Sequence, residues 1–369
     1  MPYKISGTTE AARIIIIEES GYTIESNTNE SSGAYEVDAL DSSDKLVVAR
    51  KSDGEVSVYG NVTPIEYTPP PRGVFAGGSN TSNDEVNTVD YITISTTGNA
   101  TNFGDLLQAT QHCGGASNGP TNRGTFFGGN NGSGTWFNNI SYVTISTASN
   151  STDFGDLTTH MSHLDGASNN TNNRAIVGGG YGDAYASINS IQYFTISSLG
   201  NTTDFGDLTR TRYSAGVCAN GTNDRCLIAG LDAAVQSIDY ITISNAANAI
   251  SFGNLTARTK CDVRATSNLT NNRGVFGGSN DGSTNGNIID YVTISSTGDA
   301  TDFGDLTVPQ GQAGATSNGT SERGVWGGGR TTPVNINVIG YITINSASNA
   351  TDFGDLTVRR TGIGACSNA

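Results

Sequence analysis

Histidine and cysteine, the side chains best suited to metal binding and nucleophilic chemistry, are rare in this chain. His160 and His163, with Asp165 nearby, are the one group that has the composition of a metal-ligand set. No other segment supplies a partner histidine, and His112 stands apart from them, so we expect loop or surface roles for all three histidines. The sequence therefore predicts no catalytic residue, no metal site and no cofactor.

The five cysteines fit neither a zinc site nor a disulfide framework, because their number is odd and their spacing irregular. Two of them occupy the same place in related segments where other copies carry Ala or Thr, and a third replaces a Gly. Free cysteine often behaves as a small apolar side chain. We therefore expect small buried side chains at Cys113, Cys218, Cys226, Cys261 and Cys366.

A carboxylate recurs in the tetrapeptide Phe-Gly-Asp-Leu, where it could in principle bind calcium or transfer a proton. A sixth copy reads Phe-Gly-Asn-Leu, and the copies begin at Phe103, Phe154, Phe205, Phe252, Phe303 and Phe353. Catalysis needs one such group rather than five, so the recurrence indicates a structural role. Each copy is also preceded by a repeated Arg. We expect Arg72 and its equivalents to pair with these Asp side chains between strands, with simple exposure as the alternative.

The elements that position these residues repeat with a period near fifty. Successive tetrapeptides are 51, 51, 47, 51 and 50 residues apart. Each unit has an Arg-led apolar run, a Tyr-led alternating run such as Tyr91-Ile-Thr-Ile-Ser, the tetrapeptide, and a small-residue segment ending in Asn. Alternation of apolar and polar residues indicates half-buried strands. Four short strands per unit predict one blade of a β-propeller, and six Arg-led runs predict six blades.

The two ends of the array predict how the ring closes. The first unit begins at Arg72 and lacks a small-residue strand before it, whereas the last unit ends with such a strand, Gly362 to Asn368. The C-terminal strand can therefore complete the first blade, which leaves no unpaired sheet edge.

These motifs resemble the kelch repeat, in which Gly-Gly ends the second strand, Tyr opens the third, and an aromatic residue followed by Leu lies in the fourth. The resemblance covers Arg72 to Ala369, although Phe stands where the kelch pattern usually has Trp. Units of the form Tyr-Ile-Thr-Ile-Ser…Asp-Phe-Gly-Asp-Leu also resemble those in structural proteins of marine tailed bacteriophages. The sequence predicts an all-β fold that ends in a six-bladed, kelch-like propeller.

Residues 1–67 carry no repeat but contain several β-type runs, among them Arg13-Ile-Ile-Ile-Ile-Glu. The segments Gly-Ala-Tyr-Glu-Val-Asp-Ala-Leu and Leu-Val-Val-Ala-Arg resemble the small prealbumin-like sandwich called the carboxypeptidase regulatory-like domain. Such domains are usually rigid adaptors. A proline run, Pro69 to Pro71, favours an extended spacer. We predict a β-sandwich at 1–67, a linker at 68–71 and the propeller at 72–369.

The net charge of the chain and the length of its apolar stretches limit the classes of partner that we expect. The net charge of −15 and a pI near 4.4 argue against general nucleic-acid binding. The longest strongly apolar stretch, Ile14 to Ile17, is too short to insert into a membrane.

From residue 72 onward, the eight basic residues outside the repeated Arg positions all fall in or beside one set of connections, between strands 2 and 3 and between strands 4 and 1. In an antiparallel blade these connections lie on the same face of the ring, and Trp136 and several Tyr residues join them. Loops on a rigid ring commonly carry binding residues. We predict a host-contacting surface at Arg212, Tyr213, Lys260, Arg264, Arg359, Arg360 and Trp136, which would recognise an anionic or carbohydrate-rich ligand.

The phage resemblance implies a virion structural protein present in multiple copies: an exposed appendage, such as a tail fibre, a tail-associated protein or a head decoration, that contacts the host surface. Its expected partners are other virion proteins, through the N-terminal domain, and a host-surface glycan. Two alternatives stay open at this stage. One is a glycan-degrading propeller enzyme, and the other is a purely structural decoration of capsid or tail without a ligand.

Overall fold

The structure is a computed structural model of residues 1–369. Before residue 71 it describes only the backbone of seven strands. From residue 71 to 368 it describes all residues except 119–121, 170–172, 183–184, 220–223, 231–235, 257–260, 268–271, 281–283 and 318–321. Every regular element of the described residues is a β-strand, and none of their segments forms a helix long and apolar enough to cross a membrane.

The chain divides into two compact units, Met1–Pro69 and Pro70–Ala369. Strands of the first unit form two antiparallel sheets, with the orders β4-β1-β7 and β3-β2-β5-β6. Their side chains lie outside the described residues, so the sandwich stays a prediction. The strands are β1 (Tyr3–Thr9), β2 (Arg13–Ile17), β3 (Thr23–Ser26), β4 (Gly33–Ala39), β5 (Lys45–Arg50), β6 (Val56–Val62) and β7 (Ile65–Glu66).

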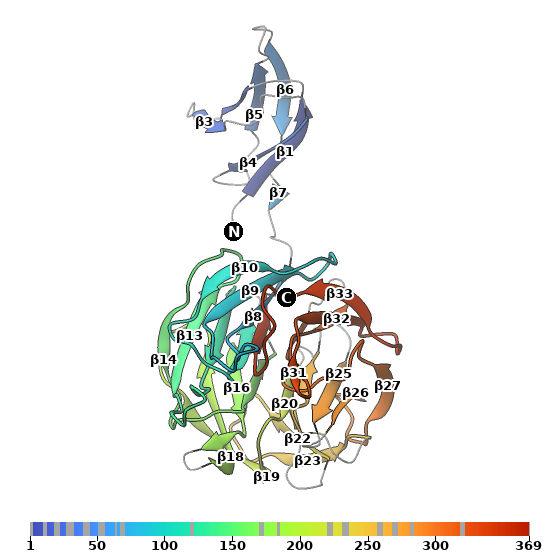
Figure 1. The fold of residues 1–369 in the computed structure, drawn as a ribbon. Helices are drawn as coiled ribbons and strands as arrows, with labels where there is room; N and C mark the ends of the chain where they lie inside the picture. Colours follow the sequence, from blue (N-terminus) through green and yellow to red (C-terminus); the bar gives the residue numbers. More distant parts are fainter. Residues whose placement is uncertain are drawn as a thin grey trace. The chain divides into compact units, whose positions relative to one another are not determined.

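The second unit is a six-bladed β-propeller of small antiparallel sheets (Figure 1). The small-residue segments form the innermost strand of each blade, and they contact one another around the axis. In blade order these are β34 (Gly364–Ser367), β11 (Gly114–Asn118), β15 (Asp165–Ser168), β20 (Gly216–Ala219), β24 (Arg264–Thr266) and β28 (Gly314–Ser317). The Arg-led runs form the second strands, β8 (Arg72–Ala76), β12 (Arg123–Phe127), β16 (Arg174–Gly178), β21 (Arg225–Ala229), β25 (Arg273–Asn280) and β29 (Arg323–Gly327).

The Tyr-led runs form the third strands and the Phe-Gly-Asp runs the outermost ones. The third strands are β9 (Thr88–Thr93), β13 (Asn139–Thr144), β18 (Ala186–Thr195), β22 (Ser237–Thr242), β26 (Asn285–Thr293) and β32 (Val338–Thr343). The fourth are β10 (Thr101–Asp105), β14 (Thr152–Asp156), β19 (Thr203–Arg212), β23 (Ile250–Asn254), β27 (Thr301–Asp305) and β33 (Thr351–Asp355). Short strands in the connections are β17 (Tyr181–Gly182), β30 (Arg330–Thr331) and β31 (Val334–Asn335).

The C-terminal strand closes the ring as predicted. β34 pairs antiparallel with β8, from Gly364 opposite Ala76 to Ser367 opposite Gly73, and the first blade has the order β10-β9-β8-β34. The two ends of the ring meet in Figure 1, where β8 lies beside the C-terminus. Closure gives β8 an innermost partner, so the first blade has four strands like the others, and the short inner edges of the blades lie protected around the axis.

The hydrophobic core is divided among the junctions between blades. Between blades 1 and 2, Val74, Val89 and Phe103 pack with Phe126 and Val143. Each of these side chains is at most 3 % exposed. The alternation of the strands explains this arrangement, since one face of every sheet packs against the preceding blade and the other against the next.

Phe-Gly-Asp forms a direct backbone contact between neighbouring blades. Phe103 lies at a register shift in the pairing of β10 with β9, and its ring meets that of Tyr91 edge to face at 5.9 Å. Gly104 has a φ of 151°, and a Cβ there would lie 2.4 Å from the carbonyl oxygen of Ser149 in the next blade. No side chain fits such a gap, so only Gly allows this approach.

Hydrogen bonds complete the same contact. The N–H of Asp105 donates to Oδ1 of Asn150 (3.0 Å), and the N–H of Ser151 donates back to the carbonyl of Asp105 (2.8 Å). The backbone N–H of Asn254 makes the equivalent bond to Asp299 (2.9 Å), which explains why Asn is tolerated in the sixth copy. The repeated Asp is therefore a structural residue, as expected.

The predicted pairing of the repeated Arg with these Asp side chains is wrong. The Arg72 guanidinium lies over the Tyr91 ring, 4.4 Å from its centroid, and Nη1 donates to the carbonyl oxygens of Ile145 and Ser146 in the next blade. The other five repeated Arg side chains stack on the Tyr of their own blade in the same way. The planar guanidinium stacks on the Tyr ring with its face and donates hydrogen bonds to the carbonyl oxygens from its edge.

Removal of Gly362–Ala369 should destabilise the whole ring. The deletion exposes the edge of β8 and removes Ile363 and Ala365 from the core around Phe75. Loss of a buried Ile alone costs about 2–5 kcal/mol. We expect the melting temperature to fall by roughly 10 °C or more. Deletion of Ala369 alone is the control, and a truncated chain that melts within about 2 °C of the full-length protein would contradict the closure.

Candidate functional site

The connections between second and third strands and those between fourth and first strands meet on one face, which we call the loop face. The N–H of Gly78 donates to the carbonyl of Thr110 (2.7 Å), and the N–H of Ser79 donates to Thr361 (2.8 Å). Gln111 and Asn130 exchange two backbone hydrogen bonds of 3.0 Å. Loops of neighbouring blades thus form a continuous, hydrogen-bonded surface, as the predicted topology requires.

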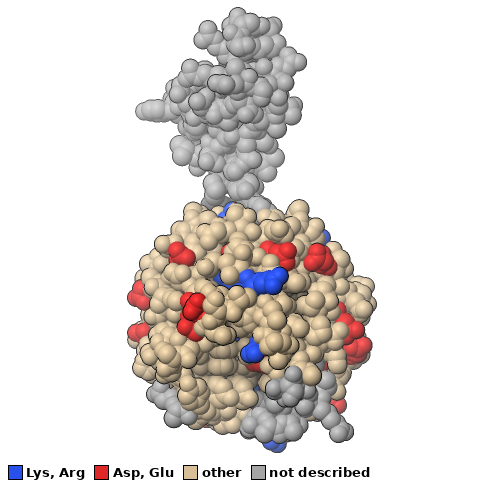
Figure 2. Space-filling model, viewed as in Figure 1, with Lys and Arg blue, Asp and Glu red and all other residues tan. Residues whose placement is uncertain are grey.

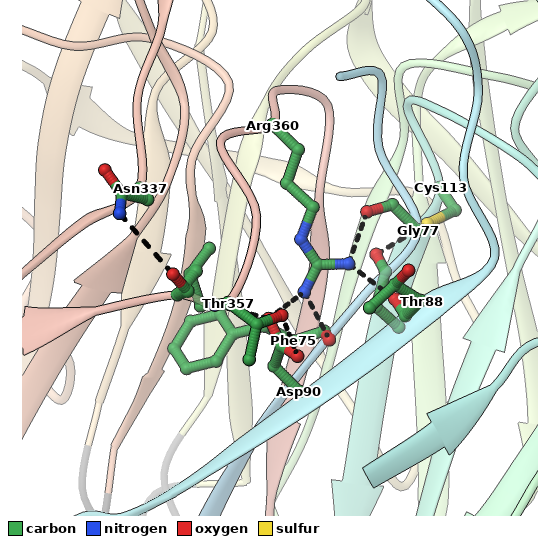
Figure 3. Close-up of polar contacts among 10 residues, drawn as sticks. Phe75, Gly77, Thr88, Asp90, Cys113, Asn337, Thr357 and Arg360 are labelled. Carbon is green, nitrogen blue, oxygen red and sulfur yellow. Dashed lines mark hydrogen bonds and ion pairs between the residues drawn. The ribbon is translucent and has the colours of Figure 1, made fainter. Parts of the chain in front are cut away.

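Two of the predicted surface residues are buried, and that part of the prediction is wrong. Arg360 is 0 % exposed and Arg212 is 1 % exposed. Nη2 of Arg360 lies 2.9 Å from Oδ2 of Asp90 (Figure 3). Nη2 of Arg212 lies 2.9 Å from Oδ2 of Asp239.

The environment of Arg360 explains its burial. Besides Asp90, its guanidinium donates to the carbonyl oxygens of Phe75, Gly77 and Thr88, and Thr357 donates to the same carboxylate (Figure 3). Burial lowers the pKa of Arg360, and the charge of Asp90 opposes that shift. The junction between blades 6 and 1 can therefore bury a cation, because Arg360 from the connection between β33 and β34 meets the Asp90 carboxylate on β9 of blade 1.

The equivalent junction between blades 2 and 3 contains a neutral pair instead. Met161 takes the place of the Arg, and Gln192 takes the place of the Asp. Nε2 of Gln192 lies 3.1 Å from Sδ of Met161, and both side chains are at most 1 % exposed. The Arg–Asp pairs are therefore one of several ways in which the junctions fill the same position, which indicates a structural role.

Arg264 is also buried, at 2 % exposure, so the prediction that it lies on the surface is wrong. Its Nη1 donates to the carbonyl of Val263 (3.2 Å), while Nη2 has no hydrogen-bond partner. The side chain lies at the axis, where its charge acts on His112, His163, Asp165 and Asp262.

Around the axis the connections that precede the innermost strands form what we call the axial collar. Its members have positive φ angles between 50° and 71°. Backbone hydrogen bonds join neighbours in the collar, for example from the N–H of His163 to the carbonyl of His112 (2.9 Å). Each blade contributes one residue to this position, and five residue types occur among the six: Gly362, His112, His163, Ser214, Asp262 and Gln312.

His112 and His163 lie in the connecting loops of the axial collar, in agreement with the expected loop role, and their side chains are buried and half-buried respectively. The rings of His112 and His163 stack with centroids 3.6 Å apart, and His160 alone of the three is exposed. Burial lowers the pKa of His163 to about 3, helped by the Arg264 charge, and burial also lowers the pKa of His112 well below its ordinary value. Burial raises the pKa of Asp165 to about 6. The cluster therefore holds two neutral imidazoles beside one buried cation.

An aromatic cluster extends from the axial collar outward over blades 2 and 3. Tyr181 stacks on Tyr213 at 4.2 Å and meets the edge of His163 at 5.1 Å. Trp136 contacts Tyr185 edge to face at 4.8 Å. Tyr185 is 66 % exposed and Trp136 only 7 %, so Tyr185 presents the free ring surface.

The predicted binding residues thus separate into four groups. Arg359 is exposed on the loop face, and Tyr213 is half-buried in the aromatic cluster, where Trp136 also lies. Arg212, Arg264 and Arg360 are internal. Lys260 lies outside the described residues. On the side of the ring drawn in Figure 2, acidic groups lie around the outline and few Lys or Arg side chains reach the surface.

The cysteines are buried or half-buried and free, as predicted. Cys113, Cys218, Cys226 and Cys366 are buried, and Cys261 is intermediate. Burial raises the pKa of the Cys113 thiol to about 11. A neutral, inaccessible thiol is a poor nucleophile.

Comparison with models of known protein families finds none that matches this chain. A search of curated proteins finds no match either. The functional argument therefore depends on the geometry of the loop face.

Arg360→Met should destabilise the ring by about 3 kcal/mol, because it leaves the Asp90 carboxylate buried without its cation. Adding Asp90→Gln should recover most of this loss, since the pair then matches Met161 and Gln192. Unfolding in urea measures both changes. The exposed neighbour provides the control: Arg359→Met should stay within about 0.5 kcal/mol of the wild type. Equal losses in the single and double variants would refute the pairing.

Stability should fall as the pH drops from 7 to 5. The unfolded state takes up protons on His112 and His163 near pH 6.5, whereas the folded state excludes them, so acid favours unfolding. Asp165 acts in the opposite sense below pH 6, because its folded form binds a proton first.

Each such histidine contributes a loss of about 2 kcal/mol by pH 5. His163→Asn should therefore lose about 2 kcal/mol less than the wild type between pH 7 and pH 5. Thermal unfolding at the two pH values gives the comparison, with His160→Asn as the exposed control. Identical pH dependence in wild type and His163→Asn would exclude the axial collar as the cause.

Proposed function

We propose that this protein is a non-catalytic virion component of a tailed bacteriophage, an exposed appendage whose loop face binds a glycan of the host surface. The observation that carries the binding proposal is the aromatic cluster with its exposed Tyr185. The virion assignment is supported by the resemblance of the repeat units to phage structural proteins. In this proposal the N-terminal unit is a sandwich-type adaptor to other virion proteins, and the kelch-like ring, present in multiple copies, is the recognition part.

The aromatic cluster has the properties of a carbohydrate platform. An exposed aromatic ring offers a flat apolar surface and a polar hydroxyl, which suits the apolar face of a sugar ring. Tyr185 is held by the edge contact with Trp136, and its backbone has a φ of 59°. Such a fixed ring loses little conformational entropy when a ligand binds.

The contrast between the two faces also favours recognition over a purely structural role. On the opposite face each turn between third and fourth strands serves the same blade contact, with Asn or Asp accepting the backbone N–H. On the loop face the equivalent positions vary among the blades, as the collar residues Gly362, Ser214 and Gln312 show. Diversity on a rigid scaffold is typical of a binding surface.

A glycan-degrading enzyme is less well supported by the same geometry. Hydrolysis of a glycosidic bond usually requires two carboxyl groups flanking one bond. In the axial collar Asp262 accepts a hydrogen bond from Gln312 (3.0 Å) and is 6 % exposed, so it is engaged and covered. Asp165 is 9 % exposed and lies among backbone N–H donors.

Tyr185→Ser should weaken binding of the purified protein to the bacterial cells that the phage infects. Loss of one stacking ring costs about 1–2 kcal/mol, or roughly tenfold in affinity. Binding of fluorescently labelled protein to cells measures the effect. Leu199→Ser removes an equally exposed apolar side chain from the opposite face (58 % exposed) and should leave binding unchanged.

Two results would contradict the proposal. Equal binding by the Tyr185→Ser variant and the wild type would exclude the aromatic cluster. Failure of antibodies against the ring to label purified phage particles in electron micrographs would exclude the virion assignment.

A further inference from the structure

The loop face is hollowed between the hairpins of blades 1 and 2. This cleft has a volume of about 330 Å³ and is open to solvent. Its walls are the connections after β8 and β12, and Gln111, from the connection between the blades, forms its floor. Its polar lining consists of Ser79, Asn83, Glu85, Gln111, Asn131 and Ser133.

Glu85 is the one carboxylate in the lining of the cleft. Its Oε1 accepts a hydrogen bond from Nε2 of Gln111 (3.1 Å), which fixes the carboxylate. Among the described residues no donor is placed on Oε2. The facing loop approaches closely, since a Cβ on Gly132 would lie 2.2 Å from Oε1. The cleft thus contains an oriented carboxylate with one oxygen available to a ligand.

Donors and acceptors are distributed around this carboxylate. Oδ1 of Asn131 accepts the N–H groups of Ser133 (3.2 Å) and Thr135 (2.9 Å), which leaves its amide nitrogen as a donor. Nε2 of Gln111 is used by Glu85 and Asn130, which leaves its carbonyl oxygen as an acceptor. Asn83 stands exposed at the rim with a φ of 62°.

This lining fits hydroxyl groups, each of which donates one hydrogen bond and accepts others. Two neighbouring hydroxyls can donate to a carboxylate and a carboxamide while accepting from amide N–H groups. The lining contains no Lys or Arg, and Asp84 lies beside Glu85 in the sequence. An anionic ligand would therefore be repelled.

We infer that the cleft between blades 1 and 2 binds a neutral sugar residue through two adjacent hydroxyls, with the Glu85 carboxylate as their principal acceptor. This inference rests on the proposed glycan-binding function and names the ligand as neutral rather than anionic. The carboxylate makes charge-assisted hydrogen bonds, which are stronger than bonds between neutral groups.

The cleft is connected to the aromatic cluster through one hairpin. Asn131 and Trp136 belong to the same connection, and a Cβ on Gly134 would lie 3.9 Å from the Tyr185 hydroxyl. A glycan longer than one residue can therefore occupy the cleft and reach the Tyr185 ring.

Equivalent positions in other blades show that Glu85 is more than a link between loops. Trp136 and Asn335 occupy the same place in their hairpins, where each pairs with its second-strand partner. Nδ2 of Asn335 donates hydrogen bonds to the carbonyl oxygens of Ser79 (3.0 Å) and Asn80 (2.8 Å) of the next blade. Glu85 makes its link with one oxygen and keeps the second for a ligand.

The test uses the full chain and four probes: the methyl glycosides of glucose, galactose, N-acetylglucosamine and glucuronic acid. Saturation-transfer NMR titrations give their affinities. We expect at least one neutral glycoside to bind with a Kd near the millimolar range and the glucuronide to bind at least tenfold more weakly. Glu85→Gln should weaken the neutral glycoside by about tenfold or more.

Glu322→Gln makes the same chemical change on the opposite face and should leave the affinity unchanged. Thermal unfolding checks that both variants are folded. Undiminished binding by Glu85→Gln, or a preference for glucuronide, would overturn the inference. If no neutral glycoside binds while the protein still binds cells through Tyr185, the cleft assignment fails and the proposed function stands. If no neutral glycoside binds and the protein does not bind cells through Tyr185 either, both proposals are wrong.

Discussion

The whole ring depends on how closely the outer strand of each blade approaches the next blade. At Phe-Gly-Asp the backbone of one blade lies against the turn of its neighbour, and a side chain at Gly104 would overlap Ser149. Reciprocal backbone hydrogen bonds and the stacked Arg72 then hold the junction. Six copies of this contact set the angle between blades, and the swapped strand β34 closes the circle. The repeated residues therefore serve the contacts between blades. We expect ligand binding to depend on residues that do not repeat.

The interior of the junctions is where the blades differ in chemistry. The two Arg–Asp pairs lie at the junctions of blades 3 with 4 and 6 with 1, on opposite sides of the ring. Arg212 and Arg360 are 148 positions apart in the chain, and so are Cys218 and Cys366. These two junctions thus share an Arg and a Cys at matching positions. Matching ion pairs at these two junctions discriminate against wrong blade contacts, because a buried charge opposite Met161 or Gln192 would be unpaired.

The loop face and the axis serve different purposes. At the axis, polar side chains are covered and engaged with one another, and two neutral histidines stack near a buried guanidinium. Farther out, Tyr185 is largely exposed, and the half-buried Glu85 lines the cleft between blades 1 and 2. The recognition proposal therefore depends on the outer part of the loop face over blades 1 to 3. It requires no chemistry from the axis, whose role in the fold is to hold the connections together.

The sequence by itself determined the number of blades, the four strands in each and the closure by the C-terminal strand, because these follow from period and from the pattern at the two ends. It also placed the variable connections on one face, since strand order decides that. Only the tertiary structure decided which of the basic side chains are exposed. Arg359 and Arg360 are adjacent in the chain, yet one is exposed and the other is 0 % exposed beside Asp90. The sequence pattern did not indicate Glu85 for the same reason. Its proposed role in ligand binding depends on Gln111 and Gly132, which belong to other segments of the chain.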